Sequence, residues 1–404
     1  MTSLISCKKN KTIPDTSQTL FTVELADNFI KKDLYGFILV SDPQGNYLGD
    51  TLCQANGRYP VFLKSAYPVP SQVAITVGYV EIIMHTLTVH LNTYTGVAPY
   101  GEWKMKGNRP DTLGNAVVSL TNLPVLTGPV IYSNSGYTNM TFKTTDKEQM
   151  MYVSPDDLYI KIMTLTGDKF KIVPGITLSG NYSVDMADAV EPANHTISFP
   201  MMVLDYDISV SGYKGANLET SIPFLTDRII SDGSLINKVD LDYPPSVFTG
   251  FITEMMIRES YTSDLQWFNH ADGDIPDQFL KINAVINSVS ANSGQSSINA
   301  SGTFMMFVTN WQYTDKDNTL FDWNIFGPET SMAISLPSLS PNLQKSLPTL
   351  MADSMQYTST ELRFYPNLKN YQDILGVLYD KDRNRQPGDF EMRSVRKNAV
   401  SKRY

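Results

Sequence analysis

A short run about two thirds of the way along the chain combines residue types that could bind a divalent cation. His270, Asp272 and Asp274 alternate with Ala271 and Gly273. Side chains two residues apart in a loop can converge on one ion, and carboxylates are preferred ligands of hard cations. The pattern predicts a cation site made of His270, Asp272 and Asp274. The alternative is a surface turn composed of residues that favour turns.

Four aromatic residues gather in one later stretch of the chain. These are Trp267, Trp311, Tyr313 and Trp323, and the last two tryptophans flank a polar hairpin tip at 315–318. Exposed, these rings would form a flat platform that packs against sugar rings, with nearby Asp and Asn side chains binding hydroxyl groups. Buried, they would be ordinary core residues of alternating strands. The exposure of the rings decides between the two interpretations.

The histidines give no sign of a catalytic site. His85, His90, His195 and His270 are the complete set. None accompanies a Gly-x-Ser-x-Gly, His-Glu-x-x-His or Gly-rich phosphate-loop motif. We therefore predict no catalytic residue and no cofactor. Enzymatic activity is left open, and the sequence favours a non-catalytic protein.

Composition narrows the class of protein. Of 404 residues, 42% are hydrophobic and 18% are charged, and the net charge is -9. The charged fraction lies below the usual quarter, and the acidic balance argues against a nucleic-acid partner, which would require a basic face. Two cysteines do not make a disulfide framework. No run reaches 18 apolar residues, so no transmembrane helix is predicted.

Short segments with a period of two residues recur along the chain. Phe21, Val23 and Leu25 alternate with polar residues, for example, as in a half-buried strand. Such segments at spacings of 8–12 residues are typical of sandwiches. We predict an all-β fold of tandem β-sandwich domains, immunoglobulin-like or transthyretin-like. The predicted parts are an N-terminal tether at 1–18, sandwiches at 19–110 and 111–200, a larger β-domain at 201–345, and a C-terminal segment at 346–404. A short helix at Asn342–Met355, a strand pair at Glu361–Tyr365 and Ile374–Tyr379, and a basic tail are expected towards the C-terminus.

The N-terminus carries a cysteine whose thiol could be acylated. Leu4-Ile5-Ser6-Cys7 has the aliphatic, variable, small, Cys pattern of a bacterial lipobox. The residues that follow are polar and basic, as in a flexible spacer. Only Met1-Thr2-Ser3 precede the pattern, whereas a secretion signal needs a longer apolar region. This shortness predicts that the true start lies upstream or that the signal is truncated.

With its lipobox, polar spacer and β-domains, the chain resembles envelope lipoproteins of the Bacteroidota group. The resemblance implies a lipid at Cys7 that anchors the protein in the outer membrane, on the periplasmic or the surface-facing side. It also implies a non-catalytic binding, adhesive or structural module, with a glycan or protein partner at the cell surface.

Two other functions are kept as alternatives. The first is a fimbrial or pilus-like subunit that exchanges a terminal β-strand with its neighbour. Phe21–Leu25 is the candidate strand, and the idea fails if that strand is paired centrally in its sheet. The second is a glycan-active hydrolase with accessory β-domains, whose site would include His270, Asp272 and Asp274.

Overall fold

Strands dominate the computed structural model, which confirms the predicted all-β fold. The described residues are 18–26, 29–64, 68–83, 85–105, 114–135, 137–142, 148–153, 156–215, 221–230, 235–259, 263–292, 294–330, 332–379 and 390–399. The helical elements within them are α1 (Pro341–Ser346), the 3-10 turn η2 (Ala352–Ser354) and α2 (Tyr371–Tyr379). None of the helices in these ranges is long and apolar enough to cross a membrane.

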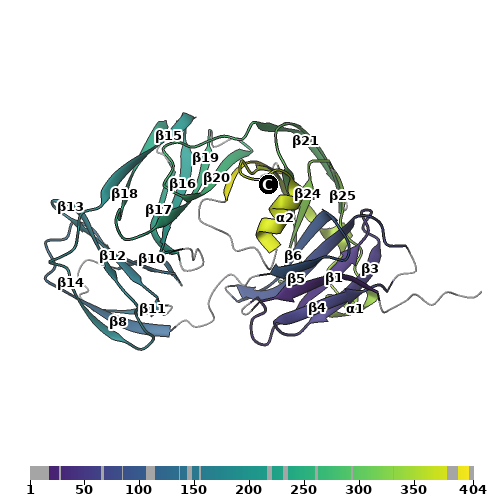
Figure 1. The fold of residues 1–404 in the computed structure, drawn as a ribbon, viewed down its shortest axis with the longest axis horizontal. Coiled ribbons are helices and arrows are strands. Elements are labelled where there is room, and N and C mark those ends of the chain that lie inside the picture. Colours follow the sequence, from purple (N-terminus) through teal and green to yellow (C-terminus); the bar gives the residue numbers. More distant parts are fainter. Residues whose placement is uncertain are drawn as a thin grey trace, which may run out of the picture.

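One long sheet organises the molecule, and twelve strands of the described chain belong to it. In spatial order these are β17 (Ile222–Ile230), β16 (Asp205–Tyr213), β19 (Gly250–Arg258), β20 (Leu265–Gly273), β27 (Glu391–Asn398), β26 (Gln356–Phe364), β23 (Met306–Thr314), β24 (Leu320–Pro328), β6 (Thr86–Val97), β5 (Val73–Ile83), β2 (Gly36–Ser41) and β3 (Tyr47–Cys53). All neighbours are antiparallel except β24 and β6, which run parallel. Figure 1 shows these strands as an arch with α2 on its inner side.

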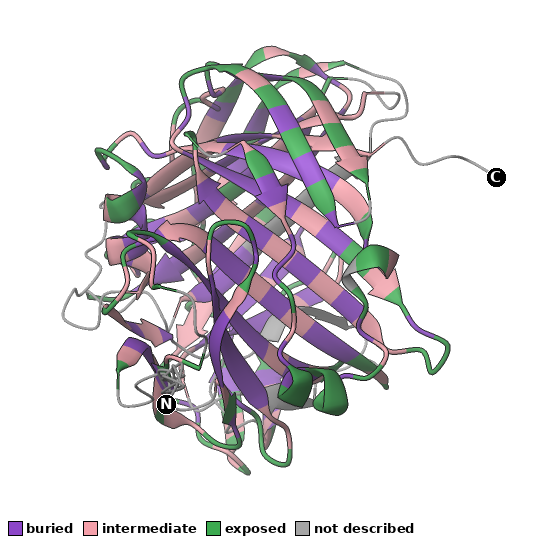
Figure 2. Ribbon diagram, turned by 90° about the vertical axis from the view of Figure 1, so that its right-hand side faces the viewer, coloured by how far each residue is buried: buried purple, intermediate pink, exposed green. Residues whose placement is uncertain are grey.

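The two faces of the long sheet pack against different layers. On the outer face, alternate residues such as Phe307, Trp311 and Trp323 enter a core that includes residues of the outer sheet and of α1. On the inner face, α2 and a small sheet cover β2, β5 and one end of the central strands. The outer sheet contains β21 (Ala284–Asn292), β22 (Gln295–Gly302) and β25 (Ala333–Ser335), and the small sheet contains β4 (Gly57–Phe62), β1 (Thr19–Leu25) and β7 (Glu102–Met105). Figure 2 shows the resulting alternation of buried and partly exposed positions along the strands.

A separate two-sheet sandwich lies at one end of the arch (Figure 1). Its core is apolar and includes Val118, Tyr132 and Ile160. Its sheets are β10 (Tyr137–Phe142), β9 (Val130–Asn134), β12 (Leu158–Thr164) and β13 (Gly167–Val173), opposite β11 (Glu148–Val153), β8 (Gly114–Thr121) and β14 (Asn181–Asp185). The pair β15 (Ala193–Val203) and β18 (Ile236–Tyr243) continues the chain from this sandwich towards the long sheet.

The long sheet crosses the boundaries that the sequence suggests. It draws strands from 19–110, 201–345 and 346–404, so those three segments do not form separate sheets. The parallel pairing of β6 with β24 joins residues more than 200 positions apart, for example His90 with Asp322. Strand patterns alone carry no information about such distant pairing.

The predicted strand at Ile374–Tyr379 is wrong, because this segment lies in α2. Its buried residues Tyr371, Ile374 and Leu375 have the 3-and-1 spacing of a helix face. The Asn370 side chain accepts a hydrogen bond from Asp373 N at 3.0 Å and caps the first turn. β26 pairs instead with β23 on one side and with β27, the last strand described, on the other.

The first and last strands of the described residues, β1 and β27, are both flanked by a strand on each side. β1 pairs with β4 on one side and with β7 on the other, and Leu20, Phe21 and Val23 on it are fully or almost fully buried. β27 lies between β20 and β26. Strand exchange through Phe21–Leu25 would require an edge strand, and β1 is not an edge strand.

Candidate functional site

The tryptophans of the proposed sugar platform are buried. Trp311 and Trp323 are 1% and 0% exposed, Trp267 is 7% exposed, and Tyr313 is partly buried against the same core. They occupy the positions of β20, β23 and β24 that point to the outer-face core, beneath the outer sheet. The platform prediction is wrong, because alternation places these rings inward and their polar neighbours on the opposite face.

His270 lies in a carboxylate cluster. Its Nδ1 is 3.3 Å from Glu254 Oε1, and its Nε2 is 3.1 Å from Asp272 Oδ1. Burial lowers the pKa of His270, but the hydrogen bonds to Asp272 and Glu254 outweigh burial, and the pKa is raised. A neutral imidazole has a single N–H, so two carboxylate partners favour the doubly protonated ring.

The predicted cation site does not form. Asp272 lies beside His270, whereas Asp274 is exposed beyond the end of β20. Within the described ranges, no group of three or more His, Cys, Asp or Glu side chains is placed to hold a metal ion. His270 and Asp272 therefore belong to an ion-pair cluster.

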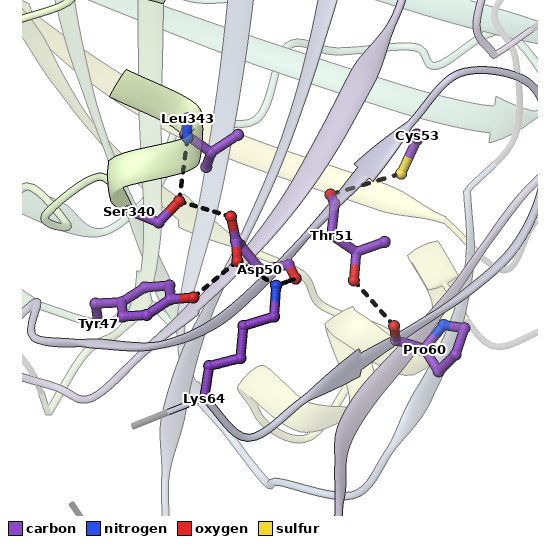
Figure 3. Close-up of polar contacts among 8 residues, drawn as sticks. All are labelled: Tyr47, Asp50, Thr51, Cys53, Pro60, Lys64, Ser340 and Leu343. Carbon is purple, nitrogen blue, oxygen red and sulfur yellow. Dashed lines mark hydrogen bonds and ion pairs between the residues drawn. The ribbon is translucent and has the colours of Figure 1, made fainter. Parts of the chain in front are cut away.

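A second carboxylate, Asp50, ties three segments together (Figure 3). Lys64 Nζ and Tyr47 Oη lie 2.6 and 2.7 Å from Asp50 Oδ1, and Ser340 Oγ donates to Oδ2 at 2.6 Å. Ser340 also caps α1, since its Oγ accepts from Leu343 N at 3.1 Å. Burial would raise the pKa of Asp50, but the bonds from Lys64, Ser340 and Tyr47 lower it. Asp50 is 4% exposed and both its oxygens are engaged, so this cluster is structural.

The strongest candidate for a binding site is a polar surface on the inner face of the long sheet, which we call the polar face. Its residues occupy facing positions on eight neighbouring strands, from β6 to β16, and most are partly exposed. They are Asn92, Asn310, Gln312, Asp322, Asn324, Ser359, Glu361, Arg396, Phe268, His270, Glu254 and Met256, with His90 at one end and Asp207 at the other.

Side-chain amides form a row at the centre of the polar face. Asn324 Nδ2 donates to Asn92 Oδ1 at 3.1 Å, and Asn310 Nδ2 donates to Asn324 Oδ1. Ser359 Oγ extends the row by donating to Asn310 Oδ1 at 2.9 Å. We call Asn92, Asn324, Asn310 and Ser359 the amide row. It crosses four adjacent strands, β6, β24, β23 and β26, because these residues are register partners.

His90 marks one end of the polar face. Its Nδ1 is 3.6 Å from Asp322 Oδ2, its Nε2 is 3.6 Å from Glu81 Oε2, and its ring stacks on Tyr79 at 4.8 Å. Burial would raise the pKa of Asp322, but hydrogen bonds with His90 and Gln312 lower it. This cluster on β6 and the His270 cluster on β20 lie on opposite sides of the four central strands β24, β23, β26 and β27.

Between these clusters, Glu361 is held by two arginines. Glu361 is 2% exposed, and its carboxylate lies 2.8 Å from Arg363 Nε and 2.7 Å from Arg396 Nη2. Burial would raise the pKa of Glu361, but Arg363 and Arg396 lower it to about 2. The Arg396 guanidinium also lies over the Phe268 ring, 4.6 Å from its centroid. The charges of this central region are thus paired with one another.

The sequence contains a signal for the polar face that motif reasoning does not use. β23 and β24 alternate bulky apolar residues with polar ones, as in Asn310-Trp311-Gln312-Tyr313 and Phe321-Asp322-Trp323-Asn324. Once the aromatic positions are assigned to the core, the polar positions must share the other face.

The predicted lipidation site, Cys7, lies outside the described residues.

Comparison with known proteins does not assign the chain to a family. No protein-family description and no curated protein matches it. A solved tetra-tandem repeat from the extending region of a large adhesion protein aligns over 94% of this chain and 99% of that chain, at 9% identity. Its TM-score is 0.13, which is too low to support any argument about fold or function.

Proposed function

We propose that this protein is a non-catalytic binding module and that the polar face is its binding surface. One observation carries the proposal. The same strands that bury aromatic and aliphatic residues on the outer face present partly exposed amides and paired charges on the inner face. A polar stripe this wide is not required for packing, because α2 and the small sheet already cover the apolar part of the inner face.

The chemistry of the polar face supports binding over catalysis. Each ring nitrogen of His270 contacts a carboxylate, so neither nitrogen is available to take a proton from a substrate. Glu361 has a lowered pKa and two arginine partners, so it is a poor general acid. The hydrolase alternative finds no supporting observation at His270, Asp272 and Asp274.

We further propose that Cys7 attaches the module to the cell envelope through a lipid. The lipobox pattern supports this, and β1 begins at Thr19 after a polar spacer. Cys53, the other cysteine, is buried, and burial raises the pKa of its thiol to about 12. Labelling with a palmitate analogue tests the proposal: incorporation should depend on Cys7 and disappear in Cys7→Ala. Equal labelling of both proteins would contradict it.

The binding proposal is tested by placing a charge on each side of the molecule. Gln312 is exposed on the polar face, and Ser290 is exposed on the outer sheet. Full-length protein with Cys7→Ser would be assayed for retention on peptidoglycan, capsular polysaccharide, mucin and fibronectin. We expect retention on at least one polymer, at least tenfold weaker binding for Gln312→Arg, and unchanged binding for Ser290→Arg. No retention, or equal effects of both substitutions, would contradict the proposal.

A further inference from the structure

We propose that the polar face binds an uncharged oligosaccharide that lies across the strands, along the amide row. This inference rests on the proposed function and adds the class of ligand. Three features of the polar face point to it: the hydrogen-bonding groups that the amides leave over, the pairing of the charges, and the position of the row on a sheet face away from any sheet edge.

The amide row and its neighbour Gln312 keep both donors and acceptors for a ligand. A side-chain amide has two N–H donors and two acceptor lone pairs. Asn92 accepts one hydrogen bond from Asn324, and Asn310 donates one and accepts one. Gln312 donates one to Asp322 at 3.3 Å. Asn92, Asn310 and Gln312 therefore each retain at least one N–H and one lone pair beyond these bonds.

Groups that both donate and accept suit a ligand rich in hydroxyls. A hydroxyl donates one hydrogen bond and accepts up to two, so one sugar hydroxyl can use the N–H of one amide and the carbonyl oxygen of the next. A phosphate or carboxylate only accepts, and an ammonium group only donates. The row repeats at the distance between strands, about 4.8 Å, so a chain of hydroxyl-bearing rings can contact several amides in succession.

The paired charges argue against a charged ligand. Glu361 has Arg363 and Arg396, and the two histidines each lie between carboxylates. Each of these groups already lies within 3.6 Å of an opposite charge, so a charged ligand would have to compete with the present partner, and a desolvated charge without a partner is costly. An uncharged ligand leaves all of these pairs in place.

The position of the row also argues against a polypeptide ligand. Extended peptides bind sheets by adding a strand at an edge, where backbone N–H and C=O groups are available. β6, β24, β23 and β26 are central strands whose backbone groups already pair on both sides. The groups available for binding here are side chains that project from a face of the sheet.

A half-buried ring, Tyr79 stacked on His90, flanks the amide row and gives the apolar face of a sugar a surface to pack against.

The test uses full-length protein with Cys7→Ser and a matched pair of substitutions. Asn92 and Asn287 each share a hydrogen bond with an asparagine on a neighbouring strand, but Asn287 pairs with Asn299 on the outer sheet, at 3.2 Å. Asn92→Leu and Asn287→Leu keep the side-chain size and remove the amide. An array of neutral hexasaccharides selects the probe. Calorimetry then measures the binding of that hexasaccharide, of polygalacturonate and of a neutral peptide.

We expect a neutral hexasaccharide to bind with an affinity that changes less than twofold between about 50 and 500 mM salt, because no ion pair is formed. Asn92→Leu should weaken binding at least tenfold, and Asn287→Leu should leave it unchanged. Absence of binding to every neutral glycan, or binding that Asn92→Leu leaves intact, overturns the inference. If polygalacturonate or the peptide binds instead and Gln312→Arg abolishes that binding, the proposed function stands and only the ligand class is wrong. If Gln312→Arg leaves all binding intact, the proposed function fails as well.

Discussion

The two faces of the long sheet are made by the same strands but carry different kinds of side chain. Trp323 on the outer face is fully buried, and its indole Nε1 donates to Thr93 Oγ1 at 2.8 Å. Asn324, the next residue, lies half-buried in the amide row. The outer face stabilises the fold by burial of apolar area, whereas the polar face contributes hydrogen bonds and ion pairs whose net effect on stability is small. The core uses one face of these strands and leaves the side chains of the other face partly exposed.

The sharpest test of this difference substitutes neighbouring residues. Trp323→Ala should lower the free energy of unfolding by about 3–5 kcal/mol, because it opens a large cavity in the core. Asn324→Ala should lower it by about 1 kcal/mol, the net value of a hydrogen bond. Urea unfolding followed by circular dichroism measures both. Similar losses for the two variants would show that the two faces contribute equally to stability.

Removal of the Glu361 carboxylate should have an intermediate effect. Glu361→Gln leaves Arg363 and Arg396 without a counter-charge. We expect the free energy of unfolding to fall by about 2–3 kcal/mol. This is less than the roughly 3–5 kcal/mol lost when a fully buried ion pair is broken, because both arginines are partly exposed. We expect Glu361→Gln to weaken ligand binding only if the substitution displaces the guanidinium groups of Arg363 and Arg396.

The same pair predicts a pH dependence. The pKa of Glu361 is about 2 in the folded protein and about 4.3 in an unfolded chain. A lowered pKa contributes stability that is present above the unfolded value and is lost as pH falls through the folded value. Wild-type protein should therefore lose more stability than Glu361→Gln between about pH 5 and pH 2. Parallel curves for the two proteins would show that the ion pair is not formed.

For His270 we expect a smaller effect on stability, with the opposite dependence on pH. Because its pKa is raised, its contribution is present below the ordinary histidine value, about 6.5, and is lost as pH rises through the folded pKa. His270→Gln should cost about 1 kcal/mol at pH 6 and less at pH 9. Thermal unfolding across this range measures it, and a cost that grows with pH would contradict the assigned protonation.

The smallest effect is expected at Gln312. Its side chain is exposed, and Gln312→Ala should change the free energy of unfolding by no more than about 0.5 kcal/mol. Binding to the retained polymer should nevertheless weaken. If Gln312→Ala changed neither the free energy of unfolding nor binding, the binding surface would lie elsewhere.

Sequence reasoning reached the fold class but not the sheet that organises it. Alternation in segments such as Phe21–Leu25 is local and predicts strands directly. The pairing of β6 with β24 depends on contacts between residues more than 200 positions apart, and no local pattern encodes it.

The polar face is not apparent from sequence motifs, for a related reason. Trp311 and Trp323 are residue types that can bind sugars, but their bulk and their alternation with polar residues place them in the core. His270 and Asp272 lie together without Asp274, and Glu254 on β19, which contacts His270, is recognisable only when the strands are paired.

The most direct test of the polar face as the binding surface is hydroxyl-radical footprinting of the full-length protein with and without the retained polymer. Phe268 and Met256 on the polar face and Tyr79 beside it report on that surface, and the exposed Met351 and Val285 report on surfaces elsewhere. We predict that the ligand protects Tyr79, Phe268 and Met256 and leaves Met351 and Val285 unchanged. Protection of Met351 or Val285 without protection of the polar face would contradict the account.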